Sequence, residues 1–245
     1  MIGTILRYEL MKWKRLYLVP AIVIAILIPP LLTGFSMSMK IKNTGAAIHW
    51  EDVLGLCLQV DHLFIFPLLF SSLTAFVFVH EFQTRSIIPL FTLPIKRTKI
   101  VTLKMFLLFF VILILSILSH LLILCVGYFF IKEPISKAFI DTLPLSIETG
   151  LMQISYVPIY MCICLWARQY VLPIVTGGIF IMTAFVALAI PKIGPFLFPA
   201  LPYFTILQGI GWSTTDIPLV WSQLIPISIF FFILSLWIAN KRDIH

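Results

Sequence analysis

Charged residues are scarce in this sequence of 245 amino acids. Only 11% of the residues are Asp, Glu, Lys or Arg, whereas a soluble domain typically carries about 25%. Hydrophobic residues make up 61% of the chain, and the mean hydropathy is +1.09. Stretches of about 20 residues with almost no charge recur, long enough for a helix to cross a hydrocarbon core of roughly 30 Å. The composition therefore excludes a soluble domain and indicates an integral membrane protein.

Motifs for nucleotide and hydrolytic chemistry are also missing. The chain has no G-x-x-x-x-G-K-[ST] sequence and no other glycine-rich phosphate cradle, which excludes ATP hydrolysis by a P-loop of its own. His80-Glu81 opens like the zinc motif H-E-x-x-H, but Thr84 stands where the second histidine belongs. There is no G-x-S-x-G motif and no pair of carboxylates inside an apolar run. We therefore expect no catalytic residue, no metal site and no cofactor bound by this chain.

The cysteines do not make a disulfide framework. The last two of the four, Cys162 and Cys164, are two positions apart, so a helix directs their side chains to nearly opposite faces. This arrangement is poor for binding a metal. We expect all of them to be small packing residues; they are Cys57, Cys125, Cys162 and Cys164.

What the sequence has in abundance is long apolar runs. Bases precede the first run, as in a signal peptide, but it exceeds the usual signal-peptide core of about 7–15 residues and no small-residue cleavage site follows it. We therefore expect it to be retained as a first span. The predicted fold is an all-α integral membrane protein that forms a single domain over residues 1–245. Its six spans lie at about 16–36, 62–80, 105–131, 149–166, 171–190 and 219–239.

The bases are unevenly distributed among the segments between these runs. Twelve of the 17 Lys and Arg residues, but only three of the ten Asp and Glu residues, fall in the two tails and in segments 81–104 and 167–170. Because cytoplasmic segments carry an excess of Lys and Arg, we expect both termini in the cytoplasm and a multi-pass protein of the plasma membrane. The same distribution accounts for the net charge of +7 without a nucleic-acid partner.

Ionisable residues inside the predicted spans are few. His120 lies in the middle of the third span, near Ser116 and Ser119. An ionisable group within a membrane is a candidate functional site; a neutral histidine that hydrogen-bonds a neighbouring helix is the alternative. Asp61 and His62 are expected at the outer edge of the second span, within reach of water. No carboxylate is expected at mid-depth, which disfavours a secondary transporter driven by protons or sodium.

One polar segment separates the second and third predicted spans. Residues 80–104 carry one acid and five bases. Pro94 is expected to end a short helix, because the residue before a proline is pushed out of the right-handed helical region. Lys96, Arg97 and Lys99 follow and are placed for phosphate headgroups or for an acidic partner surface. The alternative is a basic loop that only fixes the membrane topology.

This segment resembles the pattern E-x3-G-T-…-L-P-[VI]-x-R-…-K of ABC-2 type transporter permeases. Pro94 lies thirteen positions and Arg97 sixteen positions after Glu81, in line with the spacing of that family. One departure is Arg85 where the family has glycine; because an arginine is not buried cheaply, we expect this stretch to be more exposed here. The matching residues are Glu81, Arg85-Ser86, Leu93-Pro94-Ile95-Lys96-Arg97 and Lys104.

The rest of the layout is similar to the same family. Residues 7–15 look like its amphipathic segment before the first span. A helix there would place its apolar side chains roughly on one side and its bases largely opposite, as interfacial helices do. A long outer segment between spans five and six, here 191–218, forms short re-entrant helices in the family. The candidate residues of the interfacial helix are Glu9, Lys12, Trp13, Lys14 and Arg15.

The resemblance implies the non-enzymatic permease subunit of an exporter. A cytoplasmic coupling helix, from about Glu81 to Arg97, would dock on a separate ATP-binding cassette ATPase that binds ATP and magnesium. Glu81 would orient this helix by accepting hydrogen bonds from its N-terminal N–H groups. A second permease copy or a paralogous permease would complete the pathway across the membrane. Membrane lipid would be a further partner. The coupling residues would be Glu81, Arg85, Ser86, Leu93, Pro94, Lys96 and Arg97.

Within the family, the layout resembles lantibiotic-immunity and bacitracin-resistance permeases of Gram-positive bacteria. This resemblance implies export of an amphipathic or lipid-associated substrate, such as a lantibiotic or another peptide antibiotic, from a Gram-positive cell membrane. Two alternatives stay open. One is a membrane protein that binds and sequesters the antibiotic without energy input, and the other is a secondary transporter.

Overall fold

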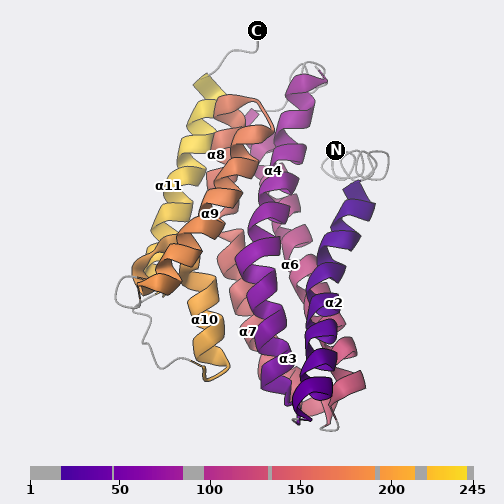
Figure 1. Cartoon of the computed structure of the whole chain (residues 1–245). Helices are drawn as coiled ribbons and strands as arrows, with labels where there is room; N and C mark the ends of the chain where they lie inside the picture. Colours follow the sequence, from indigo (N-terminus) through magenta and orange to yellow (C-terminus); the bar gives the residue numbers. More distant parts are fainter. Residues whose placement is uncertain are drawn as a thin grey trace.

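The protein is a bundle of helices that run roughly along one axis (Figure 1). Within the ranges that the structure describes the chain is helical and contains no strand, which confirms the predicted all-α class. The structure is a computed structural model that describes residues 18–45, 47–84, 97–131, 134–190, 194–212 and 220–241.

Six spans in this part of the chain are long and apolar enough to cross a membrane, in agreement with the number and order predicted. The first begins and the last ends at the same end of the bundle (Figure 1). The second and fourth spans each consist of more than one element. In chain order the elements are α2 (Leu18–Thr44); α3 (Trp50–Val60), the π-helical turn η1 (Asp61–Ile65) and α4 (Phe66–Gln83); α6 (Arg97–Phe130); α7 (Ile135–Ile154) and α8 (Val157–Ala167); α9 (Val171–Ala189); and α11 (Val220–Lys241).

The second span is longer than predicted. It covers Trp50–Gln83 instead of 62–80. Glu51 and Asp52 made its start look like part of an outer polar segment, but both lie in the first turn of α3, where the helix dipole favours acids. The helix therefore continues inward and brings Asp61 inside the span. The buried residues of α3 repeat at helical spacing: Trp50, Val53, Leu54, Cys57 and Leu58.

The fourth span consists of two helices, because α7 ends at Ile154 and α8 begins at Val157. Pro158 lies in the first turn of α8, where its missing N–H is tolerated; inside a continuous helix it would remove a hydrogen bond and clash with the preceding turn. The fourth span covers Thr142–Ala167 instead of the predicted 149–166, and α7 itself starts at Ile135.

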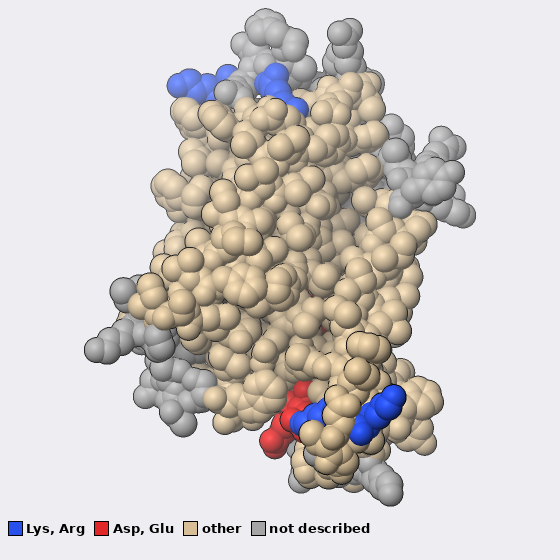
Figure 2. All heavy atoms as spheres, in the orientation of Figure 1, with Lys and Arg blue, Asp and Glu red and all other residues tan. Residues whose placement is uncertain are grey.

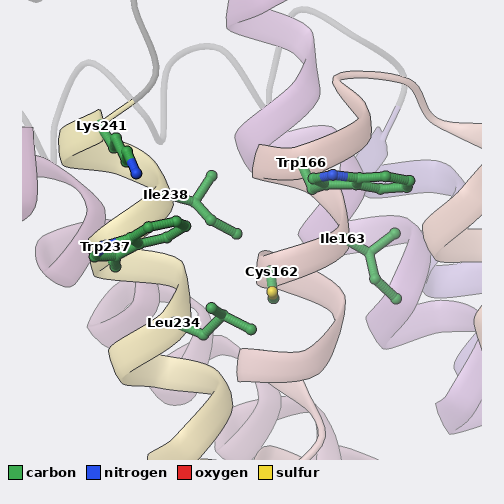
Figure 3. Close-up of a pocket in the computed structure, with 7 residues that line it drawn as sticks. All are labelled: Cys162, Ile163, Trp166, Leu234, Trp237, Ile238 and Lys241. Atoms are coloured by element: carbon green, nitrogen blue, oxygen red, sulfur yellow. The ribbon is translucent and has the colours of Figure 1, made fainter.

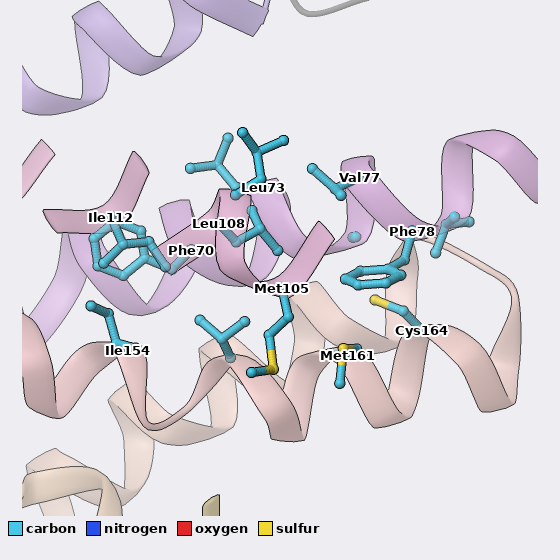
Figure 4. Close-up of a cluster of buried hydrophobic side chains, with 14 of the residues drawn as sticks. Phe70, Leu73, Val77, Phe78, Met105, Leu108, Ile112, Ile154, Met161 and Cys164 are labelled. Carbon is cyan, nitrogen blue, oxygen red and sulfur yellow. The ribbon is translucent and has the colours of Figure 1, made fainter. Parts of the chain in front are cut away.

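The centre of the bundle lies between α4, α6 and α8, whose large side chains fill it (Figure 4). The flanking helices α2 and α11 are far less buried. In their most apolar stretches 28% and 17% of the residues are buried, against 67% in the second span. Their apolar faces therefore point towards lipid or another chain. The central side chains labelled in Figure 4 are Phe70, Leu73, Val77, Phe78, Met105, Leu108, Ile112, Ile154, Met161 and Cys164.

Two glycines let neighbouring helices approach closely. A Cβ atom on Gly177 of α9 would lie 2.5 Å from Ser71 Oγ and 2.7 Å from the carbonyl oxygen of Pro67 in α4. A Cβ atom on Gly127 of α6 would overlap the ring of Trp50. Small residues at such contacts allow membrane helices to pack with their backbones close together.

The segment between α9 and α11 folds back against the bundle. Leu201 of its longest helix is fully buried, and Tyr156 Oη donates a hydrogen bond to the carbonyl oxygen of Phe198 at 2.9 Å. This helix lies beside α7 (Figure 1). The described elements of the segment are the 3-10 turns η2 (Gly194–Phe196) and η3 (Phe198–Ala200) and the helix α10 (Leu201–Gly209).

Charged side chains gather at the two ends of the bundle, and the face seen in Figure 2 has an uncharged belt between them. This belt suits a hydrocarbon core. At the end away from the start of α2, Lys40 pairs with Asp52 at 3.2 Å. The other end, where α2 begins, is called the basic end, and its described bases at the helix termini are Arg97, Lys99, Arg168 and Lys241.

Candidate functional site

The last turn of α4 lies at the basic end, directly before segment 85–96. Three consecutive residues of this turn each contact a different side chain. Because consecutive residues of an α-helix point about 100° apart, one turn reaches both α6 and the connection between α8 and α9. These residues are called the α4-end cluster: His80 with Tyr170, Glu81 with Lys104, and Phe82 with Arg168.

Glu81 and Lys104 form a buried ion pair between α4 and α6. Each residue is only 3% exposed. Lys104 Nζ also donates to the carbonyl oxygen of Val77 at 3.1 Å and lies 5.8 Å from the centre of the Phe78 ring. A buried charge is tolerated only when it is paired and hydrogen-bonded in this way. The pair therefore joins the two helices that flank segment 85–96.

The other two contacts hold the connection between α8 and α9. His80 Nδ1 lies 3.2 Å from Tyr170 Oη, and burial raises the pKa of Tyr170, so its hydroxyl stays protonated at neutral pH. The Arg168 guanidinium lies 5.2 Å from the centre of the Phe82 ring, within the range of a cation–π contact. Arg168 ends α8 with a left-handed backbone, φ 54°. The α4-end cluster thus joins α4, α6 and the start of α9.

The structure places only part of the predicted coupling site. Glu81 lies in the C-terminal turn of α4 and pairs with Lys104 of α6, whereas the N–H groups of the predicted coupling helix belong to residues outside the described ranges. Arg97 is the first residue of α6 and is half-buried. The other predicted coupling residues lie outside the described ranges, as does the whole predicted interfacial helix: Arg85, Ser86, Leu93, Pro94 and Lys96, and Glu9, Lys12, Trp13, Lys14 and Arg15.

Sequence reasoning missed most partners in the α4-end cluster. Phe82, Arg168 and Tyr170 carry no motif, and His80 belongs only to the incomplete zinc motif. Topology offered the one usable signal: segments 81–104 and 167–170 fall on the same side of the membrane in any six-span arrangement, so their residues can meet.

His120 makes the contacts expected of a histidine that binds a neighbouring helix. It is completely buried. Its Nδ1 lies 2.7 Å from Ser146 Oγ, and its Nε2 lies 3.4 Å from Thr142 Oγ1. Both hydroxyls belong to α7, so the imidazole joins α6 to α7 through two polar contacts.

The sequence predicted Asp61 and His62 at a water-exposed edge of the second span, but the structure buries both residues. Their exposed fractions are 0% and 4%, because the second span begins at Trp50 and places both residues in its interior. Ser119 of α6 donates to Asp61 Oδ2 at 2.5 Å, and Gln153 of α7 donates to the carbonyl oxygen of His62 at 3.3 Å. The sequence-based argument against a secondary transporter, the absence of a buried carboxylate, is therefore wrong.

A groove lies between α8 and α11 at the basic end (Figure 3). Its volume is about 640 Å³. Trp166 and Trp237 stand on its two sides and are 57% and 55% exposed. Lys241 lies at the basic end of the groove, with Nζ 4.7 Å from the centre of the Trp237 ring. The remaining lining residues are Cys162, Ile163, Leu234 and Ile238.

Comparison with known proteins identifies the family. The profile of the family described as ABC-2 family transporter protein matches residues 5–186, which is most of the chain and includes the entire α4-end cluster. No curated protein matches the sequence significantly. With six membrane spans and this extensive match, the chain belongs to the ABC-2 family of transporter proteins.

Proposed function

We propose that the chain is the permease subunit of an exporter driven by a separate ATP-binding cassette ATPase. The α4-end cluster is the observation that carries this proposal. Segment 85–96 is bounded by α4 and α6, and Glu81 and Lys104 join these helices just outside it. A partner that displaces the segment therefore moves both helices together, as a rigid-body transition requires. Segment 85–96 and Arg97 are the surface proposed for this partner.

The α4-end cluster also extends the displacement to a third helix. Phe82 contacts Arg168, and His80 contacts Tyr170 next to the first residue of α9. Gly177 packs α9 tightly against α4 further along the span. A movement at segment 85–96 is thus expected to carry α4, α6 and α9 together, while α11 packs mainly against α8.

The groove between α8 and α11 supports an amphipathic or lipid-associated substrate that enters sideways from the bilayer. Its walls are apolar, and its exposed tryptophans lie near the basic end of α8 and α11; tryptophan suits the boundary between acyl chains and headgroups. Lys241 adds a positive charge that complements an anionic headgroup. A lipid-linked or peptide antibiotic exported as self-protection fits this arrangement, and the lysine favours an anionic, lipid-linked molecule over a cationic peptide.

A second permease subunit, either another copy or a paralogue, completes the proposed exporter. The exposed apolar faces of α2 and α11 are available for it. In this arrangement the substrate leaves between the two subunits, and the basic end faces the cytoplasm of a Gram-positive cell, as the excess of Lys and Arg favours.

The test is purification of the tagged full-length protein from its native membranes in mild detergent, with mass spectrometry of the proteins that accompany it. We expect a stoichiometric soluble ATPase with a Walker A motif. Glu81→Lys should release this ATPase while the permease still inserts into the membrane. Glu51→Lys controls for the reversal of charge alone, because Glu51 is exposed at the opposite end, and it should keep the ATPase. A folded, protective permease that brings no ATPase would contradict the proposal and favour energy-independent sequestration.

A further inference from the structure

We propose that Asp61 is a proton-binding site inside the second span, reached through His120 from the end opposite the basic end. Asp61 is completely buried. One carboxylate oxygen, Oδ2, accepts a hydrogen bond from Ser119 Oγ at 2.5 Å. The other, Oδ1, is buried and has no hydrogen-bond partner. The structure thus holds a carboxyl group with one oxygen satisfied and one left open.

The charge around Asp61 favours a neutral carboxylic acid. No Lys or Arg of the described chain forms an ion pair with it, whereas the other deeply buried acid, Glu81, has Lys104. An ionised carboxylate without a cation in such surroundings is costly, and a buried acid avoids the cost by taking up a proton. A metal ion is a poorer occupant, because the described residues contain no cluster of three His, Cys, Asp or Glu side chains that could hold one.

The π-helical turn places further polar groups beside Asp61. His62 follows it in η1 and is 4% exposed. Gln153 of α7 donates to the His62 carbonyl oxygen, and its Nε2 lies 3.5 Å from His62 Nδ1. Its own oxygen, Oε1, is buried without a partner. Asp61 Oδ1 and Gln153 Oε1 are therefore both buried without a hydrogen-bond partner. One belongs to η1, and the other belongs to the α7 side chain that contacts the next residue of η1.

The proposed route to the first half of α7 begins with two consecutive residues of α6. Ser119 bonds Asp61, and His120 follows it about 100° around the helix, so the step between these two side chains is the inferred part of the route. The imidazole of His120 has one nitrogen next to Ser146 and the other next to Thr142, and an imidazole can take up a proton at one nitrogen and release one at the other. Thr142 is only half-buried. It lies in the first half of α7, towards the end opposite the basic end.

The other elements packed around Asp61 bring few titratable groups to it. Cys57 lies one turn earlier on α3 and is buried. Tyr203 is the titratable residue of α10 and is half-buried, and Glu148 is a half-buried acid of α7. α9 carries no titratable side chain, and the charged residues of α2 lie at its end, where Lys40 pairs with Asp52. Cys57, Asp61, His62 and His120 are therefore the titratable groups that the described residues bring to this site.

The experiment uses the purified full-length permease in lipid nanodiscs. A hydrophobic carbodiimide, which reacts with protonated carboxyl groups inside membranes, is applied over a range of pH, and the modified residues are mapped by mass spectrometry. We expect modification at Asp61, with its extent falling as the pH rises, and none at the exposed Glu51. Asp61→Asn should lose this modification. Because that variant is isosteric, its thermal unfolding serves as the folding control.

Infrared difference spectra provide a second measurement on the same samples. The carbonyl band of a protonated carboxyl group should be present in the wild type and absent in Asp61→Asn. After a jump in pH, the band should change more slowly in His120→Ala than in the wild type. An unmodified Asp61 without this band, or modification that sodium but not choline suppresses at constant pH, would overturn the proton site. An unchanged rate in His120→Ala would overturn the route. None of these results depends on an ATPase.

Discussion

The contribution of the buried ion pair between Glu81 and Lys104 to stability can be tested by substituting each partner. Removing one partner leaves the other charge buried and uncompensated, which typically costs 3–5 kcal/mol. Glu81→Gln and Lys104→Met should therefore each lower the melting temperature of the purified protein strongly. The exchanged pair Glu81→Lys with Lys104→Glu should recover most of that loss, because both charges keep a partner.

Transport by the same three variants separates two roles of Glu81. If Glu81 acts only through its pair, the exchanged variant regains transport together with stability. If Glu81 also contacts the ATPase, stability returns and ATP-driven transport does not. An exchanged variant no more stable than the single variants would show that the pair does not hold α4 to α6.

Asp61 shows why a buried polar residue is hard to place from sequence. Its neighbours Glu51 and Asp52 are exposed or half-exposed acids, so local composition pointed to an outer segment. The apolar residues between them repeat at helical spacing, from Trp50 through Val53 and Leu54 to Cys57 and Leu58, and this pattern leads to Asp61 on the same face. The partner that fixes its environment, Ser119, lies 58 positions away, and single-sequence reasoning has no access to that pairing.

Among the helices, contacts of small residues determine how closely α4 and α9 pack. Gly177→Ala would place a methyl group 2.5 Å from Ser71 Oγ and 2.7 Å from a backbone oxygen. Overpacking of this kind typically costs 1–3 kcal/mol. Gly178→Ala is the matched control, because a Cβ atom there has no neighbour within 4 Å and alanine is the better helix former by about 1 kcal/mol.

Thermal unfolding in detergent checks this prediction. Gly177→Ala should melt at a lower temperature than the wild type, and Gly178→Ala at the same or a higher temperature. Equal destabilisation by both changes would mean that the glycines matter for their backbone freedom and not for the contact between α4 and α9.

The number and order of the spans followed from hydropathy, whereas their lengths did not. Membrane thickness fixes only a minimum length for a span, and α6 exceeds its predicted start by eight residues because Arg97 to Lys104 continue the helix beyond the apolar run. Lys104 directly precedes the predicted start of that span, yet it is buried and pairs with Glu81. Tertiary partners therefore decided where polar residues could extend a helix.

Across the whole protein, the groove between α8 and α11 yields a prediction about lipid. Its aromatic walls and Lys241 should retain anionic phospholipid from the native membrane, because one positive charge near a membrane surface contributes about 1 kcal/mol to such binding. Native mass spectrometry of the detergent-solubilised protein should show bound anionic lipid, and Lys241→Gln should lose about fivefold in affinity for it, the equivalent of about 1 kcal/mol.

Lys99→Gln is the matched control for this measurement, because Lys99 is an exposed base at the same end but does not line the groove. The two variants carry the same net charge, so a nonspecific electrostatic effect weakens both equally, whereas a lipid held in the groove distinguishes them. Trp237→Leu should weaken binding of anionic and zwitterionic lipids alike, since it removes part of the wall and leaves the charge in place. If Lys241→Gln and Lys99→Gln retain lipid equally, the groove does not select headgroups, and α11 is then better explained as a surface covered by a second permease subunit.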